Sequence, residues 1–80
     1  MAIYIIINKS YETTESVAYM YSPDGNAWGE FLISKNNLEP QLIKGVDGEK
    51  NNFYLLRAWS TVRKEYMSNG IFPEETCYAA

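Results

Sequence analysis

The sequence contains no histidine and a single cysteine, Cys77. Without histidine the chain lacks the side chain that most often acts as general acid or base near neutral pH. One cysteine excludes a disulfide within the chain, and the lack of histidine also excludes a zinc site built from cysteine and histidine. No glycine-rich phosphate-binding loop is present either. We therefore expect a protein that is not an enzyme and that uses no cofactor or metal.

Few other side chains could carry chemistry. Cys77 has no histidine to activate its thiol. The adjacent Glu74 and Glu75 suit a solvated acidic loop. Asp47 and Glu49 provide too few oxygen ligands for a calcium loop and fit a turn with a helix cap. We expect no small-molecule substrate.

The length and charge of the chain limit its organisation and its partners. Eighty residues, 46% of them hydrophobic, suit one small folded domain spanning 1–80. Ten acidic and seven basic residues give a net charge of -3, which opposes binding to nucleic acid and to anionic membranes. The apolar opening, Ala2–Ile7, is too short for a signal peptide or a membrane span. We expect a cytoplasmic protein without a membrane partner.

The first half of the chain has the composition of β-strands. β-Branched and aromatic residues are concentrated in short runs separated by turn residues, as in an antiparallel meander. The polar stretch 8–14 is predicted to be a loop. The expected strands, of which the last is the weakest, are Ala2–Ile7, Glu15–Tyr21, Trp28–Ser34 and Gln41–Val46.

The most specific local signal lies between the second and third expected strands. In Tyr21–Trp28, Pro23 presets φ, Asp24 can accept hydrogen bonds from the N–H groups that follow, and Gly25 can take a positive φ. This stretch resembles the Tyr-Ser-x-Asp-Gly-x-x-Trp hairpin of discoidin-type sandwiches. It is more loosely similar to the Asp-box of sialidase-like propellers, from which it lacks one residue. The resemblance covers eight residues and implies a turn geometry, not a function.

The second half changes to the period of an amphipathic helix, predicted over Asn51–Ser68. One apolar stripe faces the core, and Asp47 or Asn51 can cap the start. Asn69-Gly70 offers a C-terminal stop, with Pro73 beyond it. The residues of the stripe are Leu55, Ala58, Trp59, Val62 and Tyr66. The predicted fold is α+β, an antiparallel sheet of three to four strands with one C-terminal helix packed on one face, followed by a tail over Phe72–Ala80.

The predicted strands carry apolar side chains on both faces. Ile5 and Ile7 alternate with Tyr4 and Ile6 in the first strand, and the second strand is similar. The faces of the second strand are Val17, Tyr19 and Tyr21 against Ala18 and Met20. One helix covers only one side of such a sheet. The other side is either a contact surface or is covered by the tail through Phe72 and Tyr78, and the sequence leaves both alternatives open.

The function expected from these observations is non-enzymatic protein binding. Inhibitors, immunity proteins against toxic enzymes, and subunits that dimerise through their sheet share this small size, acidity and surplus of aromatic residues. The candidate contact residues, which we expect on the outer sheet face, are Tyr4, Tyr19, Tyr21 and Trp28.

The alternative function is binding of single-stranded nucleic acid, with the sheet tyrosines stacking on bases. Its basic residues would be Arg57, Arg63 and Lys64 on the helix. We do not favour nucleic acid as the partner, because these charges point away from the uncovered sheet face.

Overall fold

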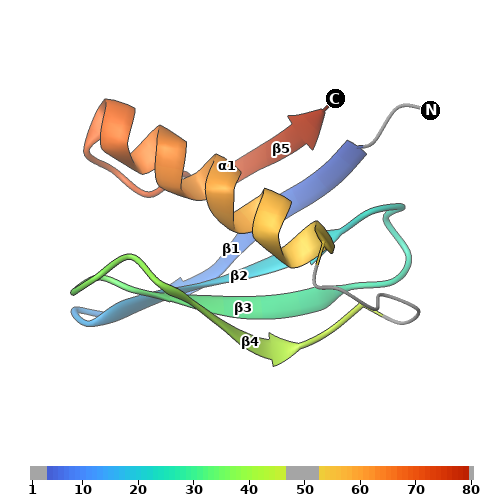
Figure 1. Cartoon of the computed structure of the whole chain (residues 1–80), viewed down its shortest axis with the longest axis horizontal. Coiled ribbons are helices and arrows are strands. Elements are labelled where there is room, and N and C mark those ends of the chain that lie inside the picture. Colours follow the sequence, from blue (N-terminus) through green and yellow to red (C-terminus); the bar gives the residue numbers. More distant parts are fainter. Residues whose placement is uncertain (1–3, 47–52, 80) are drawn as a thin grey trace.

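In a computed structural model, which describes residues 4–46 and 53–79, the chain forms a five-stranded antiparallel sheet and one helix (Figure 1). The predicted α+β class is confirmed. The strand order across the sheet is β4-β3-β2-β1-β5. The elements are β1 (Tyr4–Glu12), β2 (Ser16–Ser22), β3 (Gly29–Ser34), β4 (Pro40–Lys44), α1 (Phe53–Asn69) and β5 (Glu75–Ala79).

The first four strands follow one another across the sheet as a meander, in agreement with the sequence. The predicted number of three to four strands is wrong, because the expected tail contains the fifth strand. β5 pairs antiparallel with β1 along the edge that β2 leaves free. A tail lying across the sheet would leave the N–H and C=O groups of that edge of β1 to solvent, whereas β5 binds them.

β1 is also longer than predicted. The polar residues from Asn8 to Glu12, expected in a loop, continue the strand and pair with β2. The pairing is irregular between Lys9 and Tyr11, so that Ser10 has no partner in β2. Most side chains of this segment are exposed, which is why a strand tolerates them here.

The core contains one buried cluster in which α1 and the strands meet. Three helix residues of the predicted stripe, Leu55, Ala58 and Val62, belong to it, while Trp59 and Tyr66 pack against it half-buried. The indole N–H of Trp59 donates to the carbonyl oxygen of Leu38 at 2.8 Å, which ties α1 to the β3–β4 turn. The strand residues of the cluster are Ile5, Ile7, Val17, Tyr19, Tyr21, Phe31 and Ile33.

The helix ends where the sequence predicts. Gly70 has a φ of 77°, and its N–H donates to the carbonyl of Tyr66 at 2.7 Å. A left-handed glycine in this position closes a helix without steric cost. The predicted caps at the other end, Asp47 and Asn51, lie outside the described residues.

The β2–β3 hairpin has the predicted turn chemistry. One carboxylate oxygen of Asp24 accepts hydrogen bonds from the N–H groups of Asn26 and Ala27 at 2.8 and 2.9 Å. The hydrogen bond from Ala27, and then that from Asn26, lower the pKa of Asp24. Gly25 has a φ of 84°, which a residue with a side chain rarely adopts.

Gly29 lies so close to its neighbours that adding a single methyl group there should destabilise the fold. A Cβ at this position would lie 2.6 Å from the ring of Tyr21 and 2.8 Å from the carbonyl oxygen of Lys44. Because Tyr21 is held in the core, we expect Gly29→Ala to lower the free energy of unfolding by about 2–3 kcal/mol in urea titrations. Gly45→Ala is the control, since its Cβ meets nothing within 4 Å. Equal losses in the two variants would contradict this account.

Candidate functional site: the outer face of the sheet

The strand register defines a face of the sheet that points away from α1. Residues paired directly across strands share a face. Ile6 pairs with Ser22 and Cys77, Met20 with Asn8 and Glu30, and Leu32 with Ala18 and Gln41. None of these residues belongs to the core cluster under α1. We call this side the outer face, with Tyr4 and Glu75 at its β1–β5 end.

The centre of the outer face is apolar and open. Met20 is 38% exposed there, with Ile6 and Leu32 half-buried on the neighbouring strands, while Tyr4, 53% exposed, lies at the β1–β5 end of the face. A hydrogen bond between the Tyr4 hydroxyl and the thiol of Cys77 raises the pKa of Tyr4. The β2–β3 hairpin loop covers one part of this face, because the N–H of Gly25 donates to the buried Ser22 hydroxyl at 2.7 Å and a Cβ at Gly25 would lie 3.8 Å from Ile6. Tyr4 and Met20 remain exposed beside it.

The described part of the tail, Phe72–Ala79, does not cover this face. Phe72 is buried on the helix side, where its ring stacks on Tyr66 with 4.1 Å between the centroids. Tyr78 packs half-buried against the same core. Glu75–Ala79, which include Tyr78, form β5 at the edge of the sheet. Of the two sequence alternatives, the described residues therefore match the open face.

Two of the four predicted contact residues are in the core, which corrects the prediction for them. Tyr19 and Tyr21 have no exposed surface and pack around Phe31, at centroid distances of 5.8 and 5.6 Å. The strand turns its larger side chains toward α1 because burial of these rings contributes most to the core. Tyr4 does lie on the outer face, and Trp28 is half-buried in the hairpin loop before β3.

The outer-face residues that the sequence prediction missed are Ile6, Met20 and Leu32. Their signal was the alternation itself, because Met20 falls between Tyr19 and Tyr21 and must point to the opposite side. The prediction weighted aromatic character over alternation. The two sides of β2 carry Tyr19 and Tyr21 on one and Met20 on the other. The side that faces the helix is buried, and the other side is exposed.

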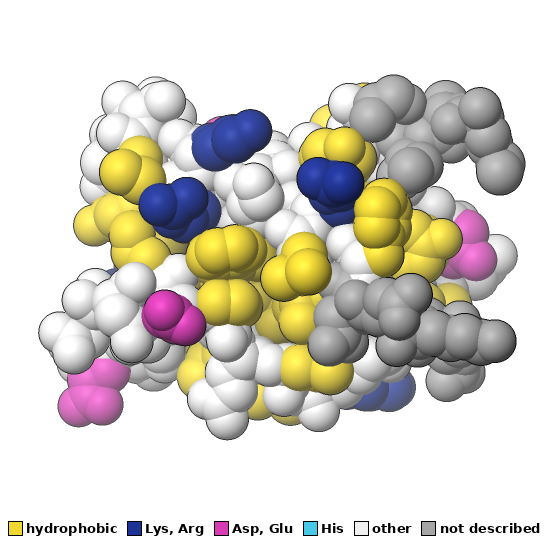
Figure 2. All heavy atoms as spheres, in the orientation of Figure 1, with side chains coloured by type: hydrophobic (Ala, Val, Ile, Leu, Met, Phe, Trp, Pro, Cys, Tyr) yellow, Lys and Arg dark blue, Asp and Glu magenta, His cyan; other side chains and the backbone are white. Residues whose placement is uncertain are grey.

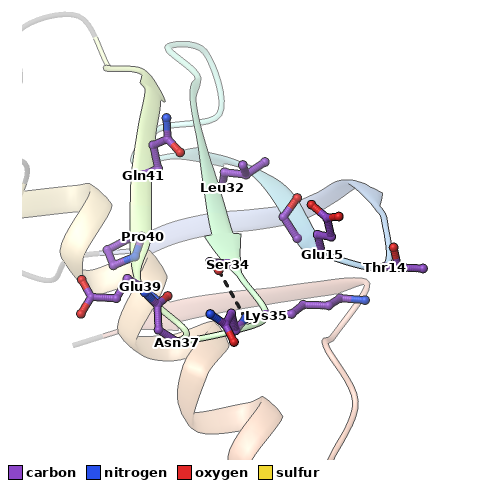
Figure 3. A pocket seen from close by; sticks show the side chains of 11 residues that line it. Thr14, Glu15, Leu32, Ser34, Lys35, Asn37, Glu39, Pro40 and Gln41 are labelled. Atoms are coloured by element: carbon purple, nitrogen blue, oxygen red, sulfur yellow. Dashed lines mark hydrogen bonds between the residues drawn. The ribbon is translucent and has the colours of Figure 1, made fainter.

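An open groove of about 850 Å³ continues the outer face toward the turns that follow β1 and β3 (Figure 3). Leu32 lies between Glu15 on one side of the groove and Gln41 on the other. The remaining lining is mostly polar. It consists of Thr14, Ser16, Ser34, Lys35, Asn36, Asn37, Glu39 and Pro40.

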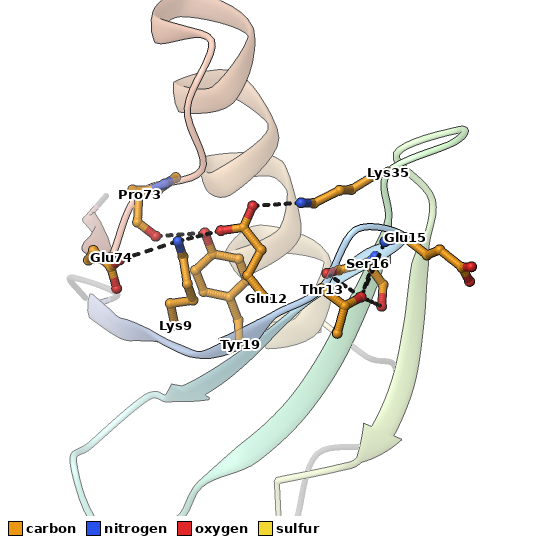
Figure 4. A network of polar contacts seen from close by, with 9 residues as sticks. All are labelled: Lys9, Glu12, Thr13, Glu15, Ser16, Tyr19, Lys35, Pro73 and Glu74. Atoms are coloured by element: carbon orange, nitrogen blue, oxygen red, sulfur yellow. Dashed lines mark hydrogen bonds and ion pairs between the residues drawn. The ribbon is translucent and has the colours of Figure 1, made fainter.

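Two lysines near the groove, Lys9 and Lys35, form ion pairs with glutamates (Figure 4). Glu12 accepts from Lys9 and from Lys35, both at 2.7 Å, and Lys9 also lies 3.4 Å from Glu74. The hydrogen bond from Lys35, and then that from Lys9, lower the pKa of Glu12. Four other carboxylates on or beside the outer face make no ion pair with any described residue. These are Glu15, Glu30, Glu39 and Glu75, which we call the acidic rim.

Tyr19 holds the chain that leads into β5. Its hydroxyl donates to the carbonyl oxygen of Pro73 at 2.6 Å (Figure 4). Burial raises the pKa of Tyr19, so the hydroxyl stays protonated and able to donate. Tyr19 therefore has a structural role that joins β2 to the start of the last strand.

No family model, curated protein or solved structure matches this chain. Within residues 4–46 and 53–79, no group of histidine, cysteine or acidic side chains is arranged to hold a metal ion. The helix described here lacks the length and apolar character needed to cross a bilayer.

The bond to Pro73 predicts the effect of removing one oxygen atom. We expect Tyr19→Phe to lower the free energy of unfolding by about 1–2 kcal/mol, because the Pro73 carbonyl loses its partner in a partly buried place. Tyr11→Phe is the matched control, since Tyr11 is 51% exposed. Urea titrations of both variants measure the difference, and an unchanged Tyr19→Phe protein would refute the structural role.

The ion pairs of Glu12 predict a pH dependence of stability. Because the folded-state pKa of Glu12 is lowered, its contribution is complete above the ordinary value of 4.5 and is lost as pH falls through the lower folded value. Glu12→Gln should cost about 1 kcal/mol or less at pH 7, as surface ion pairs do, and nothing near about pH 2. Glu15→Gln, which breaks no ion pair, is the matched control at pH 7 and should cost less there than Glu12→Gln. A loss for Glu12→Gln that is the same at both pH values would contradict the assignment.

Proposed function

We propose that this chain is a non-enzymatic protein-binding module that docks a basic partner protein on the outer face of its sheet. The observation that carries the proposal is the apolar surface of that face, where Met20 at the centre and Tyr4 at the β1–β5 end are exposed and no described segment covers these two side chains. Contiguous apolar surface on a small protein usually marks an interaction site.

The side chains of this centre suit an interface. Tyrosine brings a large rigid ring with one hydrogen-bonding tip, and methionine adapts its shape to a partner. Ile6 and Leu32 supply a flatter apolar surround. A chain of eighty residues has a small core, so that binding of a partner to the folded state also adds stability.

The charge distribution favours a basic partner on this face. The four carboxylates of the acidic rim border the apolar centre and outnumber Lys44, which lies opposite Glu30, and Lys35 in the groove, and the whole chain has a net charge of -3. On the helix side, by contrast, Figure 2 shows Lys and Arg side chains (dark blue) over α1. A positively charged protein is therefore attracted to the outer face and steered away from the helix. An inhibitor or immunity protein acting in the cytoplasm on a basic enzyme is the form of this function that we favour.

Nucleic-acid binding receives less support. Tyr19 and Tyr21, which would stack on bases, are buried under α1. The guanidinium groups of Arg57 and Arg63 lie over the rings of Phe53 and Trp59 on the helix, at 5.0 and 5.7 Å from the ring centroids. The tyrosine platform and the basic stripe that this function needs are thus not brought together on one exposed surface.

A pair of lysine substitutions tests the docking face. Met20→Lys places a cation in the apolar centre, whereas Met67→Lys makes the same change on α1, where Met67 is 65% exposed. Immobilised wild type and both variants are exposed to extract of the source cells, and bound proteins are quantified by mass spectrometry. We expect Met20→Lys to reduce capture of the specific partner roughly tenfold or more, as loss of an interface centre does, and Met67→Lys to leave it unchanged.

The captured partner is then purified and titrated directly against the three proteins at low and high salt. Affinity that falls with salt supports recognition by the acidic rim. Equal capture by Met20→Lys and Met67→Lys would exclude the outer face as the docking surface. Binding that is insensitive to salt would exclude the basic partner.

A further inference from the structure

The sheet ends at β5 with an edge whose hydrogen-bonding groups can be assigned. The N–H of Lys9 donates to the carbonyl of Glu74 at 2.7 Å, next to the paired residues of β1 and β5. Antiparallel ladders alternate between hydrogen-bonded and non-hydrogen-bonded pairs. Thr76 and Tyr78 therefore direct their main-chain groups toward β1. Glu75, Cys77 and Ala79 direct theirs away from the sheet.

The opposite edge, β4, is built to resist pairing. It begins with Pro40 and ends with Lys44, and its register with β3 shifts so that Ile43 is an extra residue. Proline, lysine and bulges are the usual means by which proteins protect an edge strand. β5 spans five residues without proline, lysine or a shift in register. Among residues 4–46 and 53–79, β5 is therefore the edge that is open to another strand.

We propose that two copies of this chain associate by antiparallel pairing of their β5 strands, about a two-fold axis between the two Cys77 residues. This goes beyond the proposed function, because it uses the sheet edge and leaves the outer face free. Cys77 then pairs with Cys77 of the second copy, Thr76 with Tyr78, and Glu75 with Ala79. Every residue of β5 is paired, and no two like charges are opposed.

The second copy is the occupant because α1 provides matching charges beside this edge. Glu65 accepts a hydrogen bond from the Thr76 hydroxyl, and the guanidinium of Arg57 lies 5.9 Å from the ring centroid of Tyr78. In the proposed register Thr76 faces Tyr78 of the second copy. This register brings Glu65 of each chain toward Arg57 of the other chain. The two-fold axis therefore creates two equivalent contacts between these residues. An unrelated strand would not supply this pattern.

The proposed register can be tested through the distance between the two Cys77 residues. Cys77 would occupy a hydrogen-bonded pair, in which Cα atoms lie about 5.5 Å apart. That separation falls within the range that a disulfide spans. A register centred on Thr76 would instead oppose Cys77 to Glu75 and leave the thiols apart. Cys77 is exposed and free, so an added oxidant can report which register forms.

The first experiment measures association of the full chain under reducing conditions by sedimentation velocity over about 10 µM to 1 mM. Pairing of one short strand makes a small interface, so we expect a reversible dimer within this range. Glu75→Pro removes an outward N–H and leaves the β1 ladder intact, and it should weaken association roughly tenfold or more. Glu75→Gln keeps the N–H and should associate as the wild type does. Diamide should link the wild-type dimer through Cys77, and linkage should fall with Glu75→Pro.

The second experiment is a charge exchange. Arg57→Glu and Glu65→Arg each oppose like charges across the two-fold axis, and each should weaken the dimer roughly tenfold. The two substitutions combined restore opposite charges and should recover association. A role of these residues within one chain would not produce this recovery, because they lie eight positions apart on α1 and do not contact each other there.

Several results would overturn the proposal. A chain that stays monomeric throughout the concentration range would overturn it. A dimer whose Cys77 residues do not crosslink, or whose association is unaffected by Arg57→Glu and Glu65→Arg, would also overturn it. Met20→Lys separates this proposal from the docking of a partner, since it should leave the β5 dimer unchanged. Loss of dimer in Met20→Lys, with Glu75→Pro still dimeric, would show association through the outer face instead.

Discussion

The register that β2 shares with its neighbours is the constraint on which the rest of the structure depends. It turns Tyr19 and Tyr21 to the same side as Ile7 and Phe31, and this side receives the apolar stripe of α1. A shift of one residue would exchange the two faces of the strand. The same register therefore determines both the composition of the core and the side chains, Met20 among them, that are left on the other side. The core and the candidate site thus both follow from the pairing of β2 with β1 and β3.

The last strand depends on contacts that its own sequence does not supply. The Tyr19 hydroxyl donates a hydrogen bond to the carbonyl oxygen of Pro73, and the N–H of Lys9 donates to the carbonyl oxygen of Glu74. The chain therefore enters β5 aligned with β1. The hydroxyl of Thr76 donates to Glu65 and fastens the strand to the helix as well. Three elements thus fix a segment of five residues that is too short to be stable as a strand by itself.

Local signals in the sequence were sufficient for the α+β class, the meander, the hairpin at Asp24 and the end of α1 at Gly70. Each of these depends on residues close together in the chain. The fifth strand was missed because Glu75–Ala79 becomes a strand only beside β1, about seventy residues earlier in the chain. The expected place of Tyr19 and Tyr21 on the outer face was wrong for a related reason. Alternation divides the side chains of β2 into two groups, but only the position of α1 decides which group is buried.

The two borders of the sheet differ, and this difference limits how large an assembly can become. Pro40, Lys44 and the extra Ile43 make β4 a poor template for another strand, while β5 is regular along its length. A molecule with two regular borders could join head to tail without end and grow into a filament. With a single usable border, joining through the main chain stops once that border is occupied. The irregular fourth strand thus protects the protein from fibrous aggregation.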